Sequence, residues 1–137
     1  MAVPVLYLNP ERKQELDAGF AAAFGGIPGR YFSAPGRTEI GGNHTDHQRG
    51  RVLAAAVNLD TVAAVRVNGT DTIRILSQGY PLCQVDVKEL TPRQEEINTT
   101  PALIRGVAAR FAQLGCKVQG FDAYCESTVL PLSLIHI

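Results

Sequence analysis

The chain has 137 residues, of which 45% are hydrophobic and 19% are charged, and its 13 basic residues balance its 13 acidic ones. This length suits one domain with its own core and is too short for two ordinary domains. Because the formal net charge is zero, no long-range field attracts nucleic acid or an anionic membrane, and a small ligand fits better as the partner.

The cysteines and the N-terminus indicate the compartment. Three cysteines without CxxC spacing favour reduced thiols over a disulfide framework. The N-terminus lacks the basic start and long apolar run of a secretory signal. No apolar stretch approaches the roughly 20 residues that a membrane helix needs. We therefore expect a soluble, cytoplasmic protein with neither a membrane nor a nucleic acid as partner.

Two helices are expected. The first follows Asn9, which can cap it, and has Pro10 at its first position. Its apolar residues recur every four positions and predict a stripe that packs in the core: Leu16, Phe20 and Phe24. The second starts at Thr100 and ends before Gly115, and it also has apolar residues at helical spacing: Leu103, Val107, Phe111 and Leu114.

Five segments are expected to be strands: 30–33, 52–67, 72–77, 82–87 and 120–127. They are rich in β-branched or aromatic residues, or alternate between apolar and polar residues. Asn68-Gly69 is a strong hairpin signal between the second and third of them. The simplest arrangement is therefore an antiparallel meander of the second, third and fourth strands.

The stretch from Ala34 to Gly50, APGRTEIGGNHTDHQRG, contains four glycines, one proline and many polar side chains. Glycine loses more backbone entropy on folding than any other residue and buries no side chain. We therefore interpret this stretch as a loop built for polar contact with a ligand.

Four side chains of this stretch suit a sugar and a phosphate. Arg37 offers a permanent cation with five N–H donors in a fixed fork, which matches phosphate oxygens. His44 and Asp46 are two residues apart, so in an extended backbone they emerge on the same side, with Asn43 nearby. An ionised carboxylate can accept hydrogen bonds from two adjacent sugar hydroxyls.

These residues carry a family resemblance. Ala34-Pro35-Gly36-Arg37, followed by Gly42-Asn43-His44-Thr45-Asp46, resembles the sugar-binding signature of galactokinases, members of the GHMP kinase superfamily, whose usual form is APGRVNLIGEHTDY. The resemblance implies an α+β fold: a truncated N-terminal GHMP-kinase-type domain (ribosomal protein S5 domain 2-like) with a mixed or antiparallel sheet and helices. Residues 1–131 would form this partial domain.

The resemblance also implies an activity, the ATP-dependent phosphorylation of galactose at its anomeric hydroxyl. Arg37 would be the catalytic residue that stabilises the reacting groups, while Asn43, His44 and Asp46 would bind the sugar. Positioning and charge stabilisation supply most of the catalysis in phosphoryl transfer. ATP and Mg²⁺ are the implied cofactors of the full-length protein.

Three positions depart from the family pattern. Asn43 stands where the family usually has Glu, Glu39 where it has Asn, and His47 where it has Tyr. Asn43 can still bond a hydroxyl but lacks the charge that strengthens such a bond. A sugar related to galactose is therefore an alternative substrate.

The cofactor part of the family pattern is missing from this chain. The Gly- and Ser-rich phosphate loop would follow the strand 120–127, but no glycine follows Gly120. Residues 132–137 form an apolar tail without a turn or cap signal, and we interpret this tail as non-native. We therefore predict that the chain by itself is inactive.

Other interpretations stay open. His44, Asp46 and His47 resemble part of the HxHxDH metal motif of metallo-β-lactamase-type hydrolases, but Gly42 stands where that motif needs a histidine. A galactokinase-like sensor would bind the sugar without catalysis. Arg37, His44 and Asp46 would also be compatible with a simple network within a surface turn.

Overall fold

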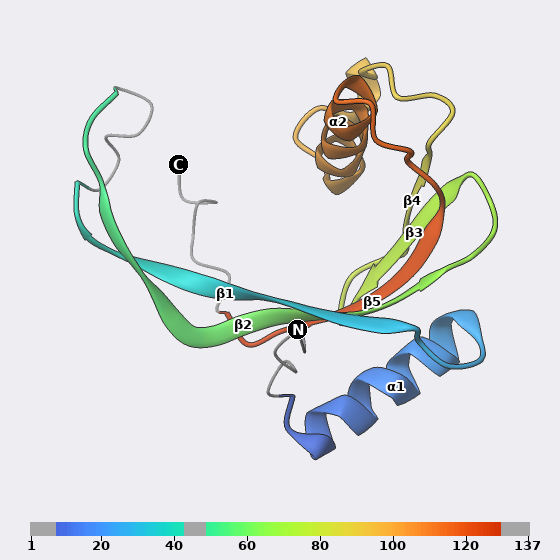
Figure 1. The fold of residues 1–137 in the computed structure, drawn as a ribbon, viewed down its shortest axis with the longest axis horizontal. Coiled ribbons are helices and arrows are strands. Elements are labelled where there is room, and N and C mark those ends of the chain that lie inside the picture. The colour runs from blue at the N-terminus through green and yellow to red at the C-terminus, as the bar shows by residue number, and fades with distance from the viewer. Residues whose placement is uncertain (1–7, 43–48, 130–137) are drawn as a thin grey trace.

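The computed structural model of the protein describes residues 8–42 and 49–129 (Figure 1). Two α-helices, a short 3-10 helix and five strands follow one another in these ranges: α1 (Pro10–Phe24), β1 (Arg30–Gly41), β2 (Leu53–Val67), β3 (Thr72–Ser77), β4 (Cys83–Asp86), η2 (Gln94–Glu96), α2 (Thr100–Gln113) and β5 (Phe121–Ser127). The two predicted helices and four of the five predicted strands are confirmed to within two residues. Neither α-helix in the described ranges is long and apolar enough to cross a membrane.

The strands form one mixed sheet in the order β1-β2-β5-β3-β4. β5 runs antiparallel to β2 and parallel to β3, while β3 and β4 form an antiparallel hairpin. The predicted α+β fold with a mixed sheet is confirmed. The predicted meander is wrong, because β5 lies between β2 and β3 and these two strands do not pair.

The Asn68-Gly69 turn explains why the hairpin signal misleads. Gly69 does adopt a positive φ of 69°. However, Asn68 donates through Nδ2 to the Thr72 carbonyl at 3.0 Å and to Asp122 Oδ1 at 2.8 Å. The Gly120 N–H bonds the Thr70 carbonyl at 3.0 Å, so the start of β5 occupies the place that a hairpin partner would take.

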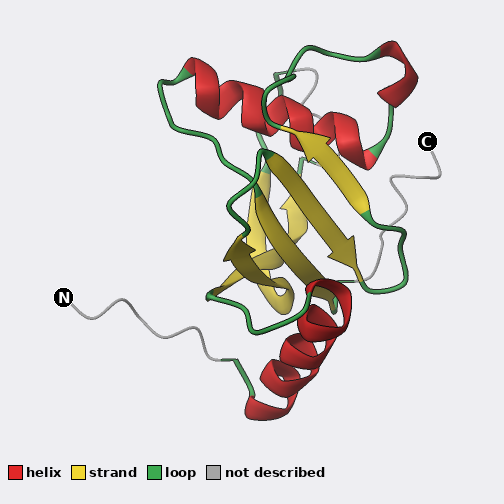
Figure 2. Ribbon diagram, turned by 90° about the vertical axis from the view of Figure 1, so that its right-hand side faces the viewer, coloured by secondary structure: helices red, strands yellow, loops and turns green. Residues whose placement is uncertain are grey.

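The two helices cover opposite faces of the sheet (Figures 1 and 2). On one face, Leu16 and Phe20 of α1 pack with Val62 and Ala64 of β2, and all four are fully buried. On the other face, α2 covers the β3–β4 end in a second cluster: Ile73, Val85 and Ala108. The predicted cap of α1 is confirmed, since Asn9 Oδ1 accepts a hydrogen bond from the Glu11 N–H at 3.0 Å.

A buried carboxylate joins three strands at the centre of the sheet. Asp122 of β5 is fully buried and accepts from Arg74 of β3 through two bonds of 2.7 and 2.8 Å. Arg66 of β2 lies 3.6 Å away. Burial opposes ionisation, but the hydrogen bonds from Arg74 and Asn68 outweigh it, so the pKa of Asp122 is below its ordinary value. The folded state therefore favours the ionised form of the Asp122 carboxylate.

The first strand is much longer than predicted. We expected a strand at 30–33 followed by a loop, but β1 continues to Gly41 and pairs with β2 as far as Leu53. Register shifts between Pro35 and Arg37 and between Glu39 and Gly41 absorb the irregular residues. β1 is an edge strand, so Pro35 removes no bond that the sheet needs.

β5 pairs with β2 only from Thr61 to Val67. The part of β2 before Thr61 therefore pairs with β1 alone and forms a two-stranded ribbon with the second half of β1. This ribbon projects beyond the rest of the sheet in Figure 1. The first half of the Gly-rich stretch lies on it.

Candidate functional site

The predicted site residues divide between described and undescribed parts of the chain. Arg37 lies on β1 in the ribbon. Asn43, His44 and Asp46, together with His47, lie outside the described residues. The contacts of these four side chains stay predictions, and the geometry of the site is built here from Arg37 and the residues that hold the ribbon.

Arg37 presents its guanidinium to solvent. Its side chain is 70% exposed, and its Nη2 lies 3.3 Å from Glu39 Oε1. The two residues are two positions apart on a strand, so both side chains leave the ribbon on the same side. Ion pairs that are this exposed are weak because water screens them. An incoming phosphate or carboxylate can therefore replace Glu39 as the partner of Arg37.

Two glycines shape the backbone on either side of Arg37. A Cβ at Gly36 would lie 3.0 Å from the Val129 side chain, 3.1 Å from that of Val57 and 3.3 Å from the Leu59 carbonyl. Gly42, at the end of the ribbon, has a φ of 82°, and a Cβ there would collide with the Arg51 backbone. These glycines therefore serve close backbone packing and chain direction as well as ligand access.

Asp60 anchors the ribbon where it leaves the sheet. Its carboxylate accepts from Arg12 of α1 at 2.5 Å and from Ser33 of β1 at 2.6 Å. Its backbone carbonyl accepts from the Thr128 N–H at 2.9 Å. Burial raises the pKa of Asp60, but the bonds from Ser33 and Arg12 outweigh this effect and lower it overall. The ionised carboxylate thus ties β2 to α1 and β1, and the backbone carbonyl of the same residue holds the segment that follows β5.

Asp60 is only partly recognisable from the sequence. It interrupts the apolar run of β2, which marks a residue with a special role, but its partners in α1 and β1 are distant in sequence. The structure shows that Asp60 lies beside the motif, because it pairs with Pro35 across the ribbon.

A cavity of about 500 Å³ lies next to the start of the motif. Its walls come from β1, β2, the β3–β4 turn and the end of β5, and its lining includes Pro35, Gly36, Thr61, Gln78 and Glu126. The hydroxyl groups of Thr61 and Ser127, two of the lining residues, share a hydrogen bond of 2.8 Å. Burial, with a smaller contribution from the charge of Glu15, raises the pKa of Glu126. This cavity offers hydroxyl, amide and carboxyl groups that sequence reasoning did not identify.

The described residues contain no group of three or more His, Cys, Asp or Glu side chains that could hold a metal ion. The histidines and the aspartate of the alternative zinc motif, His44, Asp46 and His47, fall outside the described ranges. The hydrolase interpretation therefore gains no support from the part of the chain that the structure describes.

The fold is shared with solved sugar and mevalonate kinases. The galactokinase of Lactococcus lactis, solved in complex with galactose, superposes with a TM-score of 0.72 at 22% identity, covering 86% of this chain and 31% of that chain. The mevalonate kinase of Methanococcus jannaschii superposes with a TM-score of 0.58 at 14% identity, over 76% of this chain and 33% of that chain. The fold is therefore that of the GHMP kinases.

By sequence, the chain is similar to galactokinases. Residues 18–67 match the family model described as the galactokinase galactose-binding signature. The galactokinase of Bacillus subtilis is 33% identical over 117 residues, which are 80% of this chain and 29% of that protein. The resemblance to galactokinases is thus confirmed, and the chain spans less than a third of the length of these relatives.

Proposed function

We propose that this chain is the sugar-binding part of an ATP-dependent galactokinase that phosphorylates galactose at its anomeric hydroxyl. The observation that carries the proposal is the match of residues 18–67 to the galactokinase galactose-binding signature. This range contains Arg37 and also Asn43, His44 and Asp46, the four residues whose types suit a sugar and a phosphate. ATP and Mg²⁺ would act in the full-length protein.

The described geometry supports the role of Arg37. Its guanidinium is largely exposed, and among the described residues it pairs with the half-buried Glu39 at 3.3 Å. A fixed cation at the reacting centre stabilises the charge that develops as a phosphoryl group is transferred. The ribbon that carries Arg37 is held by Asp60 and by the close packing at Gly36. Arg37 is therefore the proposed catalytic residue, held on a strand and not on an unsupported loop.

Asn43, His44 and Asp46 are the proposed sugar-binding residues. Asp46 can accept from two adjacent hydroxyls, with each bond strengthened by the charge of the carboxylate. Asn43 supplies one donor group and one acceptor without charge. The neutral side chain at position 43 makes a relative of galactose a second candidate substrate.

The chain alone is proposed to be inactive. Residues 121–137 contain no glycine, so they offer no Gly-rich loop that could hold the phosphates of ATP. The sugar-binding residues would thus lie in the part of the full-length protein that this chain represents, and the loop that holds the phosphates of ATP would lie in another part.

Sugar binding can be tested without turnover. In a calorimetric titration of the 137-residue chain, galactose is expected to give a saturable heat that glucose does not give. Asp46→Asn removes a charge-assisted acceptor worth about 1.5 to 3 kcal/mol, so the affinity should fall by about tenfold or more. Asp71→Asn is the matched control and should leave the affinity for galactose unchanged. Asp71 is exposed, lies directly before β3 and pairs with Lys88.

Two results would contradict this proposal. One is equal binding of galactose by the wild-type chain and the Asp46→Asn variant. The other is phosphate transfer to galactose by the 137-residue chain itself, which would show that a nucleotide loop is not needed. The full-length protein separates the kinase from a sensor, since only a kinase would convert ATP and galactose to products.

A further inference from the structure

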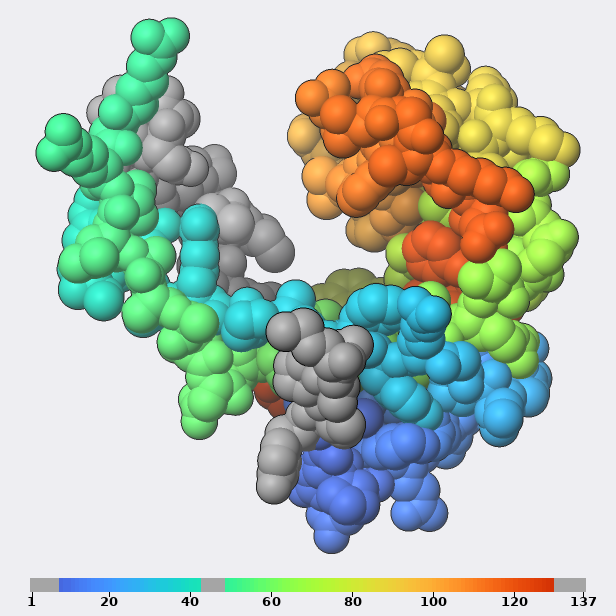
Figure 3. Space-filling view, viewed as in Figure 1, coloured from blue at the N-terminus to red at the C-terminus, as the bar shows by residue number. Residues whose placement is uncertain are grey.

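A polar pocket of about 350 Å³ lies between the first turns of α1 and the end of β5. Figure 3 shows α1 packed under the strands, on the side of the molecule opposite α2. The described residues that line the pocket are all polar or charged, and they include three carboxylates: Glu11 and Glu15 of α1 and Glu126 of β5. This lining indicates a site for a hydrophilic ligand.

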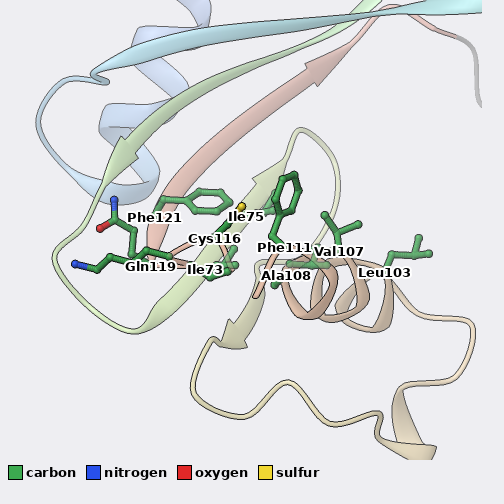
Figure 4. Close-up of a pocket in the computed structure, with 12 residues that line it drawn as sticks. Ile73, Ile75, Leu103, Val107, Ala108, Phe111, Cys116, Gln119 and Phe121 are labelled. Atoms are coloured by element: carbon green, nitrogen blue, oxygen red, sulfur yellow. The ribbon is translucent and has the colours of Figure 1, made fainter. Parts of the chain in front are cut away.

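The lining differs from that of the apolar pocket beside α2. There Leu103, Val107 and Phe111 lie in a row along α2, and Phe121 faces them from β5 (Figure 4). Apolar side chains of this kind offer no hydrogen bond to a charged molecule. A charged ligand would therefore select the pocket at α1.

Glu126 is the buried carboxylate of the pocket at α1. It lies opposite Val62 of β2, on the sheet face that α1 covers, and it is 9% exposed. Burial and the charge of Glu15 raise its pKa, the charge of Arg12 lowers it, and no hydrogen bond contributes. Among the described residues, no fully buried side-chain oxygen lacks a partner. The unbonded carboxylate of Glu126 must therefore reach open space.

A donor for this carboxylate is what the pocket lacks. Carboxyl groups that are buried to this extent are nearly always hydrogen-bonded or paired with a cation. Glu126 lines the pocket at α1 and also the cavity beside Pro35 and Gly36. A ligand that carries a positive charge can supply the donor from the pocket at α1.

The negative charge of the pocket is not balanced by its own cation. Glu11 and Glu15 are four residues apart on α1, so they lie on one face of the helix and repel each other. The one cation among the described lining residues is Arg12. Its guanidinium is already paired with Asp60, which does not line the pocket, at 2.5 Å. The pocket therefore keeps an excess of negative charge.

We propose that this pocket binds a small aliphatic diamine, with one ammonium group on Glu126 and the other on the carboxylates of Glu11 and Glu15. An ammonium group donates three hydrogen bonds and has no acceptor, which suits a site made of carboxylates. Hydrogen bonds between ionised groups are also stronger than neutral ones. Binding uses neither sugar nor nucleotide, so this site is independent of the proposed kinase function.

The arrangement favours a diamine over a bare metal ion. The described residues contain no group of three or more acidic, His or Cys side chains that could hold one ion. The three carboxylates of the pocket therefore do not converge on a single point. The volume of about 350 Å³ is within the range of pockets that hold small organic molecules. A diamine places its charges at separate carboxylates and spans the distance between them with methylene groups.

Calorimetric titration of the 137-residue chain at neutral pH and low salt tests this proposal. The probe is 1,4-diaminobutane, and we expect a saturable heat. The matched control ligand is 1,4-butanediol, which has the same chain length and no charge, and it should give no heat.

Three variants locate the site. Glu126→Gln keeps the shape of the side chain and removes its charge, so the affinity for the diamine should fall by about tenfold or more. Glu15→Gln, at an exposed position of α1, should weaken binding several-fold without disturbing the core. Glu95→Gln makes the same change at an exposed position of η2 outside the pocket, and it should leave the affinity unchanged.

Urea denaturation gives an independent readout. A ligand that binds only the folded state raises the urea midpoint. Diamine should therefore raise the midpoint of the wild-type chain and of Glu95→Gln, but not that of Glu126→Gln. A role of Glu126 in the fold alone would not make the midpoint respond to the diamine.

Three outcomes would overturn the proposal. Equal affinity of the wild-type chain and Glu126→Gln would place the diamine elsewhere. An equal rise of the midpoint with sodium chloride at the same ionic strength would show only screening of the repulsion between the carboxylates. Equal heat from 1,4-butanediol would show that the pocket recognises hydroxyl groups and not a cation. None of these measurements uses sugar or ATP, so their failure is distinct from failure of the proposed kinase function.

Discussion

Replacing Arg74 by alanine should strongly destabilise the fold. Arg74 makes both of the bidentate bonds that reach the carboxylate of Asp122, at 2.7 and 2.8 Å. Asp122 is fully buried on β5, so it cannot turn to water when its partner is lost. The Arg74→Ala variant therefore leaves an ionised group inside the sheet with only Asn68 and the more distant Arg66 beside it.

The size of the effect follows from burial. Removing one partner of a fully enclosed ion pair costs roughly 3 to 5 kcal/mol. Arg74 is 38% exposed, and Asn68 continues to donate, so we expect a loss of about 2 to 3 kcal/mol in the free energy of unfolding. With a urea m-value of about 1.5 kcal/mol/M, the midpoint should fall by roughly 1.3 to 2 M.

Urea denaturation followed by circular dichroism measures this loss. Arg93→Ala is the matched control, because Arg93 pairs with the exposed Glu89 at 2.6 Å on the surface and should cost less than about 1 kcal/mol. Equal midpoints for the two variants would refute the reasoning. The pKa of Asp122 is lowered in the folded state, so its contribution is present above its ordinary value of 3.8 and is lost as the pH falls through the folded value.

Two further predictions concern Glu126 and Gly120. The raised pKa of Glu126 means that its ionisation destabilises the fold as the pH rises through the folded pKa. Glu126→Gln should therefore raise the urea midpoint at pH 7 but not at pH 3, and an equal change at both would contradict this. A Cβ at Gly120 would collide with the carbonyl oxygens of Thr70 and Thr72, so Gly120→Ala should cost about 1 to 3 kcal/mol by thermal denaturation. Gly106→Ala, which meets nothing within 4 Å on α2, should instead stabilise by about 0.5 to 1 kcal/mol, and a similar loss in both variants would count against the steric reason.

Local features of the fold could be predicted from the sequence. The cap at Asn9 and the stripe of Leu16 and Phe20 depend on residues within a few positions of one another, and both are confirmed. The second helix and the strand at the end of the chain were also identified from spacing and punctuation. Caps and apolar spacings depend on residues that are close in the sequence, so a single sequence is enough to predict them.

Strand order could not be predicted in the same way. A parallel pairing of β3 with β5 joins residues about 50 positions apart, such as Arg74 and Asp122. Their opposite charges are visible in the sequence, but many such pairs exist in a chain with 13 acidic and 13 basic residues. Only the structure shows that Arg74 and Asp122 pair with each other across β3 and β5.

The candidate site could also be predicted only in part, because some of its supporting contacts join residues that are distant in the sequence. Residue types in the APGR and HTD segments predicted a sugar site, and the match to the galactokinase signature over 18–67 supports this. Sequence reasoning treated the glycines as a sign of a loop, whereas Gly36 and Gly41 lie within a paired strand. It also missed Asp60, because the partners that define its role come from α1 and β1.

The support of Arg37 connects the site to the rest of the fold. A two-stranded ribbon has only one ladder, so alone it would be marginally stable and would hold a side chain poorly. Asp60 corrects this at the base of the ribbon, where its carboxylate joins β1 to α1 and its carbonyl holds the end of β5. The helix α1 is thereby connected to the strand that carries Arg37. The placement of the proposed catalytic cation thus depends on the half-buried Asp60, which lies outside the Gly-rich motif, and not on that motif alone.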